Sequence, residues 1–104
     1  MKELQDRFIG KGEVKGFEFT QFKKNQYAYI YSVINFHGSS ISKRYEVFER
    51  KENHRYNCIS YPKSKSFGKW AWSVMSLDRA IDIFNEITLR KSISEAKEAS
   101  NDRV

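Results

Sequence analysis

Apolar and polar residues alternate along the first two thirds of the chain and then recur with a helical period. The clearest alternation covers residues 27–36, where Tyr29 and Tyr31 fall on one face and Ile30 and Ile34 on the other. Successive side chains of a strand point to opposite faces, and a segment that is apolar on both faces is typical of a central strand. The pattern therefore predicts a central strand at these residues.

Three further segments show strand-like alternation, and short polar turns separate them. We expect these strands at residues 13–22, 41–51 and 55–61. The spacing from Phe19 to Phe22 breaks strict alternation, which predicts a bulge near Thr20–Gln21. Turns this short favour antiparallel neighbours, because a parallel crossover needs about a dozen residues or more. Pro62, the one proline, ends the last strand because it cannot donate to a ladder.

After the proline, apolar residues recur at intervals of three and four. They are Leu77, Ala80, Ile81, Phe84 and Ile87. This spacing predicts one apolar stripe on a helix that Ser76 caps, after a short extended piece at residues 69–75. Further on, Ser92 to Glu95 fits a capping box for a short second helix. The polar end of the chain is expected to be frayed.

These elements predict an α+β domain with a four-stranded antiparallel sheet, in β-β-β-β-α order, and a C-terminal helix packed on one face. We expect residues 1–12 as an N-terminal segment, 13–91 as a single domain and 92–104 as a polar, frayed tail. Leu4, Phe8 and Ile9 are expected to form one helical turn. The 104 residues include eight Phe, six Tyr and two Trp, so a core built from large rings is expected.

The helix can cover only one face of the sheet, and the alternation leaves both orientations open. If Ile30 faces the helix, then Tyr29 and Tyr31 point outward beside Arg44 of the neighbouring strand. An exposed row of tyrosines beside arginines would form a platform for stacking unpaired bases. In the opposite orientation the tyrosines form the core under the helix, with their hydroxyls at its edge.

Positive charge is concentrated between the last strand and the helix. The chain has a net charge of +6, and residues 53–77 contain Arg55, Lys63, Lys65 and Lys69 but no acid. An acid-free basic segment favours a polyanionic partner such as nucleic acid. The alternative is a solvated lysine-rich loop anchored by Trp70 and Trp72, which strand alternation places on the same side.

Side chains suited to catalysis or metal binding are few. His37, His54 and the single cysteine, Cys58, lie in separate turns and in a short strand. A Cys–His pair needs contact and an orienting third group, and a metal needs three or four ligands. The acidic row Asp78, Asp82 and Glu86 is predicted to be a solvated helix face. We therefore expect no catalytic residue, no metal and no cofactor.

Targeting signals are also lacking in the sequence. One cysteine allows no internal disulfide, which fits a reducing compartment. The N-terminus has acids and no apolar run, unlike a signal peptide. No stretch approaches the roughly 18 apolar residues of a membrane span. We expect a cytoplasmic protein without a membrane partner.

The order of the predicted elements, with aromatic and basic residues in the strands, resembles the PUR repeat and the Whirly or coactivator-type single-strand binders. The resemblance covers roughly residues 13–87. It implies a curved sheet that binds single-stranded nucleic acid, usually in a dimer. It carries over no site residue, because it rests on element order and not on a motif.

We therefore expect a small non-enzymatic protein that binds the backbone of nucleic acid and favours single strands. The predicted contact residues are Lys63, Lys65, Phe67, Lys69, Tyr29, Tyr31 and Arg44. Such binding weakens steeply with salt. The alternative is a protein-interaction module or homodimer that uses the open aromatic sheet face, a type common among phage and mobile-element proteins. An enzyme of unrecognised type is a third hypothesis.

Overall fold

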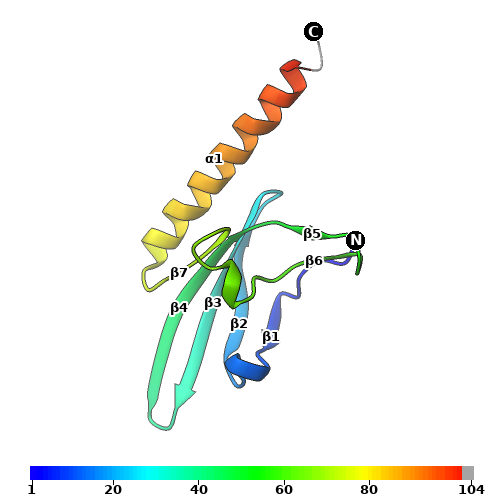
Figure 1. Cartoon of the computed structure of the whole chain (residues 1–104). Helices are drawn as coiled ribbons and strands as arrows, with labels where there is room; N and C mark the ends of the chain where they lie inside the picture. The colour runs from blue at the N-terminus through cyan, green and yellow to red at the C-terminus, as the bar shows by residue number, and fades with distance from the viewer. Residues whose placement is uncertain (102–104) are drawn as a thin grey trace.

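A five-stranded antiparallel sheet forms the centre of the computed structural model, which describes residues 1–101 (Figure 1). Its strands are β1 (Arg7–Ile9), β2 (Glu18–Lys24), β3 (Ala28–His37), β4 (Ser40–Glu49) and β7 (Ala71–Val74), in the order β1-β2-β3-β4-β7. A separate ribbon pairs β5 (Glu52–Asn53) with β6 (Cys58–Ile59). The 3-10 turns η1 (Gly12–Val14) and η2 (Ser64–Ser66) lie in the connections, and α1 (Leu77–Asn101) follows β7.

The predicted α+β class, antiparallel sheet and C-terminal helix are confirmed, but the sheet has five strands and not four. The predicted strand at residues 55–61 does not join it, because the chain turns at Asn57, whose φ is 51°, and β6 pairs with β5. The sheet instead gains β7, beside β4, and β1, beside β2. β1 lies where a helical turn was expected. With one half-buried side chain, Phe8, this strand is too short to show alternation.

The central strand β3 contributes to two cores, one on each face of the sheet. The helix-side core contains Ala28, Ile30, Val47, Ala80, Ile83, Phe84 and Ile87. The core on the opposite face, called the tyrosine face below, contains Phe19, Tyr29, Tyr31, Val33, Phe48, Ile59 and Ala71. The predicted division of β3 into two faces is therefore confirmed, with Ile30 toward the helix and the tyrosines away from it.

The tyrosine face is covered by the N-terminal segment and by the chain between β4 and β7. The hydroxyl of Tyr29 donates to Glu3 at 2.7 Å, and that of Tyr31 donates to the backbone carbonyl of Gln5 at 2.6 Å. Both tyrosines are 0% exposed. The expectation of an open tyrosine face is therefore wrong, because long-range hydrogen bonds and apolar contacts hold a second cover over it.

Helix α1 begins where the sequence predicts and continues further than expected. The hydroxyl of Ser76 accepts a hydrogen bond from the backbone N–H of Arg79 at 3.3 Å, which confirms the cap. The expected second helix from residue 92 is a continuation of α1, which reaches Asn101 in the tail predicted to be frayed. The last three residues of that tail lie outside the described part. The C-terminal half of α1 extends past the sheet (Figure 1).

Two smaller predictions have different outcomes. The bulge in β2 is present as a register shift between Gln21 and Lys23, one residue beyond the predicted place. The placement of both tryptophans on one side is wrong, since Trp72 packs on the helix-side core and Trp70 on the core of the tyrosine face. Trp70 precedes β7, so the alternation of the strand does not extend to it.

Candidate nucleic-acid interface

The cover of the tyrosine face carries the positive charge of the protein. Residues 1–17 and 50–70, called the basic layer below, contain ten lysines and arginines and four acids. The net charge of these two segments, ten basic minus four acidic residues, equals that of the whole chain, +6. From residue 71 onward there are five basic and six acidic residues. Side chains that pack from this layer onto the core are Leu4, Phe8, Val14, Phe17, Tyr61, Phe67 and Trp70. Most of the excess positive charge therefore lies in the segments that cover the tyrosine face, although Arg7 belongs to β1 and pairs with Glu18.

Within the basic layer the two 3-10 turns lie side by side, because Ser64 of η2 donates to Glu13 of η1 at 3.2 Å. Exposed lysines flank or belong to these turns, and we call this group the lysine junction: Lys11, Lys15, Lys63 and Lys65. None of the four forms an ion pair within residues 1–101. Their charges are therefore open to an external anion.

The local sequence explains the shape of η1. Gly12 and Gly16 have φ values of 61° and 85°, a region that glycine adopts without strain. These two residues let the chain turn tightly at both ends of η1 before β2 begins. The turn holds Lys11 and Lys15 on either side of Glu13, whose carboxylate is directed to Ser64. A tight glycine turn thus presents two lysines beside η2.

A hollow of about 350 Å³ lies between the lysine junction and β4. Its lining consists of Val14, Arg44, Glu46, Ser64, Phe67 and Ser73. The carboxylate of Glu46 is buried, and it accepts hydrogen bonds from the Tyr61 hydroxyl at 2.8 Å and from the Arg44 guanidinium at 2.9 Å. Burial, followed by the nearby carboxylate of Glu46, raises the pKa of Tyr61. The polar groups of the hollow therefore satisfy one another.

Arg44 and Phe67, two of the predicted contact residues, meet in this hollow. The charge of Arg44 is balanced by Glu46, and its guanidinium also lies 5.1 Å from the ring centre of Phe17. Phe67 is half-buried against the core of the tyrosine face. Both residues therefore have a structural role at the edge of the site.

The other predicted contact residues fall into two groups. Lys63, Lys65 and Lys69 are exposed on the basic layer. Tyr29 and Tyr31 are fully buried, so the prediction that they stack on bases is wrong. The N-terminal segment accepts the hydrogen bonds of both tyrosine hydroxyls. The two side chains can therefore be buried in the core instead of lying on the surface.

Sequence reasoning missed several residues of this layer. Lys11 and Lys15 lie about 50 positions before the loop lysines and join them only through the contact between η1 and η2. At the tip of the β5–β6 ribbon, Tyr56 is 67% exposed, with the guanidinium of Arg55 lying 5.3 Å from its ring centre. Gly12 and Gly16 were the sequence feature that could have identified Lys11 and Lys15, because they indicate a tight turn near these two lysines.

An ion-pair cluster fixes the N-terminal end of the basic layer. Glu3 lies 2.6 Å from the guanidinium of Arg50 and accepts the hydrogen bond of Tyr29. These hydrogen bonds, that from Arg50 first, lower the pKa of Glu3 to about 2. Burial, and then the hydrogen bond to Glu3, raise the pKa of Tyr29. Charge thus fastens the N-terminus to the end of β4.

Side chains that could hold a metal ion are not assembled in the described part. Within residues 1–101 no three His, Cys, Asp or Glu side chains are placed to hold a metal ion. Cys58 is half-buried, and His54 is exposed beside Glu52 at 3.4 Å. The side chain of His37 lies outside the described part. Across residues 1–101, α1 and the 3-10 turns include no segment long and apolar enough to cross a bilayer.

Comparison of the chain with protein-family models, with curated proteins and with solved structures finds no match.

Proposed function

We propose that this protein is a non-enzymatic nucleic-acid-binding module that contacts phosphates through the lysine junction and Lys69. The observation that carries the proposal is the group of exposed lysines that form no ion pair within residues 1–101, on the layer that holds most of the net charge. Lysines of this kind displace condensed counterions from a phosphate backbone, and the released ions drive association.

Binding is dominated by the backbone, since few rings are available to bases. Tyr29 and Tyr31 are buried, which leaves Tyr56 as the exposed ring of the basic layer, beside half-buried rings such as Phe67 and Trp70. Each base stacked on a ring contributes about 1–3 kcal/mol, so a preference for single strands would come mainly from Tyr56. Contacts from five lysines correspond to a slope of log K against log salt of about −3 to −5.

A fluorescence-anisotropy titration tests the proposal. Labelled single-stranded and duplex oligonucleotides are titrated with the protein at about 50 mM and about 200 mM salt. We expect binding at the lower concentration, little dependence on base sequence, and a loss of about a hundredfold or more at the higher one. If neither DNA nor RNA binds at about 50 mM salt, the proposal is wrong.

A second candidate function, protein interaction, is supported by an apolar area on a different part of the sheet. Beyond the helix, the side chains Phe22, Phe36 and Ile41 are 50%, 53% and 67% exposed. Phe36 and Ile41 are directly paired at the end of the β3–β4 hairpin. This area replaces the tyrosine row as the open sheet face, and the double variant Phe36→Lys/Ile41→Lys is its test in the self-association measurement described below.

A further inference from the structure

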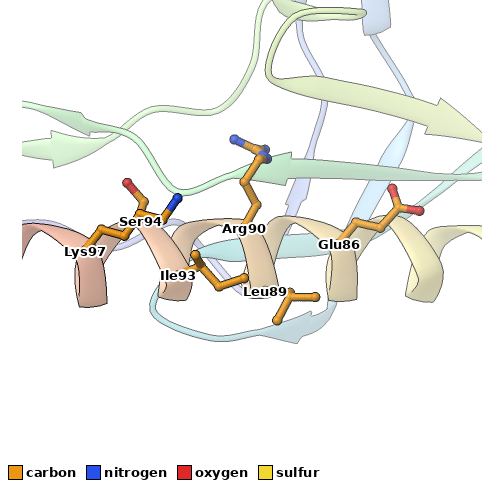
Figure 2. A pocket seen from close by; sticks show the side chains of 6 residues that line it. All are labelled: Glu86, Leu89, Arg90, Ile93, Ser94 and Lys97. Carbon is orange, nitrogen blue, oxygen red and sulfur yellow. The ribbon is translucent and has the colours of Figure 1, made fainter.

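The C-terminal half of α1 carries apolar side chains that its own sheet does not cover. Sheet-facing residues of the helix-side core end at Ile87, whereas Leu89 and Ile93 are 62% and 47% exposed. With Glu86, Arg90, Ser94 and Lys97 they line a shallow groove of about 530 Å³ that is formed by α1 alone (Figure 2). A large aliphatic side chain left in water forgoes roughly 1.5–3 kcal/mol of burial.

This half of the helix is held in place by polar contacts on the side toward the sheet. Buried Glu49 of β4 accepts hydrogen bonds from Arg90 at 3.0 Å and from Lys91 at 2.9 Å. Burial alone would raise the pKa of Glu49, but the hydrogen bonds from Lys91 and Arg90 lower it below its ordinary value. The Tyr27 hydroxyl donates to Glu95 one turn further on. Arg90 extends toward the strands and the two apolar side chains point away from them (Figure 2).

The outward stripe has the spacing of a coiled-coil seam over about three turns. Its members, at intervals of three, four and three, are Glu86, Leu89, Ile93 and Ala96. In such a seam the a and d positions face the partner helix. When two identical helices run antiparallel with a two-fold axis near residue 91, Leu89 of each lies opposite Ile93 of the other.

The same alignment places opposite charges together. Glu86 falls opposite Ala96 of the second helix, and Lys97 lies one residue further, a rise of about 1.5 Å. Glu86 and Lys97 lie on the same side of the seam, since 11 residues are close to three helical turns of 3.6. Two symmetric Glu86–Lys97 contacts therefore flank the apolar centre. A parallel alignment would instead set each Glu86 against its own copy.

We propose that the C-terminal half of α1 binds a second copy of this chain as an antiparallel helix pair centred near residue 91. The stripe is self-complementary: its apolar residues can pack on those of a second copy, and the Glu86–Lys97 pair matches only in the antiparallel arrangement. The seam is smaller than the roughly 800 Å² per partner of a standard interface, so the dimer is weak and depends on concentration. We expect a dissociation constant of about 10–100 μM.

Sedimentation equilibrium over a range of concentrations around that value measures the self-association of the full chain. Wild-type protein is expected to shift from monomer to dimer with rising concentration. Ile93→Lys is expected to weaken the dimer by tenfold or more, because it sets a charge in the apolar centre. Ile93 lies outside both cores, so the thermal unfolding of this variant should match that of the wild type.

Charge reversal tests the antiparallel alignment itself. Glu86→Lys alone and Lys97→Glu alone should each weaken the dimer several-fold, since each opposes like charges across the seam. The double variant Glu86→Lys/Lys97→Glu should recover wild-type affinity, and an equimolar mixture of the two single variants should form a heterodimer. Within its own chain Glu86 makes a long, exposed contact with Arg79 at 3.9 Å, so these changes should leave folding intact.

Three results would overturn the proposal. The first is a protein that stays monomeric at all concentrations. The second is a dimer that Ile93→Lys does not weaken, or whose charge variants show no recovery. The third is a dimer lost in Phe36→Lys/Ile41→Lys, which would place the interface on the sheet. Each leaves the nucleic-acid proposal standing, because these residues lie outside the basic layer.

Discussion

On the helix side of the sheet, Ala28 and Ile30 of β3 are covered by one regular helix through aliphatic contacts and Phe84. On the tyrosine face, Tyr29 and Tyr31 of the same strand are covered by irregular segments that are fastened by hydroxyls, an ion pair and the edge-on contact of Tyr61 with Tyr31. The difference follows from backbone hydrogen bonding. A helix satisfies its own N–H and C=O groups, whereas an irregular cover needs a partner for each of them.

The partners of the irregular cover are distant in the chain. The backbone N–H of Lys2 donates to Asn57 at 2.9 Å, and the N–H of Ile59 donates to Lys2 at 2.9 Å. A cover of this type has many polar groups turned inward, and its remaining side chains face water. In this protein those outward side chains include the unpaired lysines of the basic layer, so the less regular cover carries the candidate site.

The largest expected effects come from removing one ring from each core. Phe48→Ala removes a fully buried ring that stacks on Tyr29 and Tyr31, and Phe84→Ala removes the buried ring that α1 packs onto the sheet. Each should lower the free energy of unfolding by about 3–5 kcal/mol. Urea unfolding followed by circular dichroism measures both. A cost below about 1 kcal/mol for either variant would mean that its cover does not form the core described.

A smaller effect separates the two kinds of attachment. Tyr31→Phe removes a hydroxyl that accepts from Gln21 at 2.9 Å and donates to Gln5, and it should cost about 1–3 kcal/mol because two part-buried hydrogen bonds are lost. Ser76→Ala removes the helix cap and should cost about 1 kcal/mol. Native-state hydrogen exchange checks the location. The first variant should open the N-terminal segment, and the second should open the start of α1.

The smallest expected effect is an acid-dependent one at Glu3. Its pKa falls from 4.5 to about 2 on folding, so its contribution is present above about pH 4.5 and is lost as the pH falls toward 2. The side chain is 42% exposed, and solvent screening limits the contribution to about 1 kcal/mol or less. The stability difference between wild type and Glu3→Gln should therefore shrink between about pH 6 and about pH 3. A difference that stays constant over this range would contradict the role assigned to the ion pair.

Local periodicity made the helix side of this fold predictable. The apolar stripe from Leu77 to Ile87 predicted α1, and the alternation of residues predicted β3 and β4. Ser76 predicted the start of the helix. β1 and β7 were harder to identify, because strands of three and four residues contain too few side chains to show a period.

The cover of the tyrosine face could not be predicted in the same way. The contact between Tyr29 and Glu3 joins residues 26 positions apart, and no local pattern marks it. The loop lysines Lys63 and Lys65 were identified from local charge alone. Lys11 and Lys15 were not, since they join the site only when η1 and η2 come together.

The central claim is that the basic layer, and not positive charge in general, binds nucleic acid. The most direct test compares Lys63→Gln/Lys65→Gln with the matched variant Lys23→Gln/Lys43→Gln, whose lysines lie over Phe84 and Tyr45 on the helix side. We predict that the first weakens oligonucleotide binding about tenfold and reduces the salt slope by about 1.4–1.8, while the second changes affinity by less than about twofold. Equal losses in the two variants would contradict the claim.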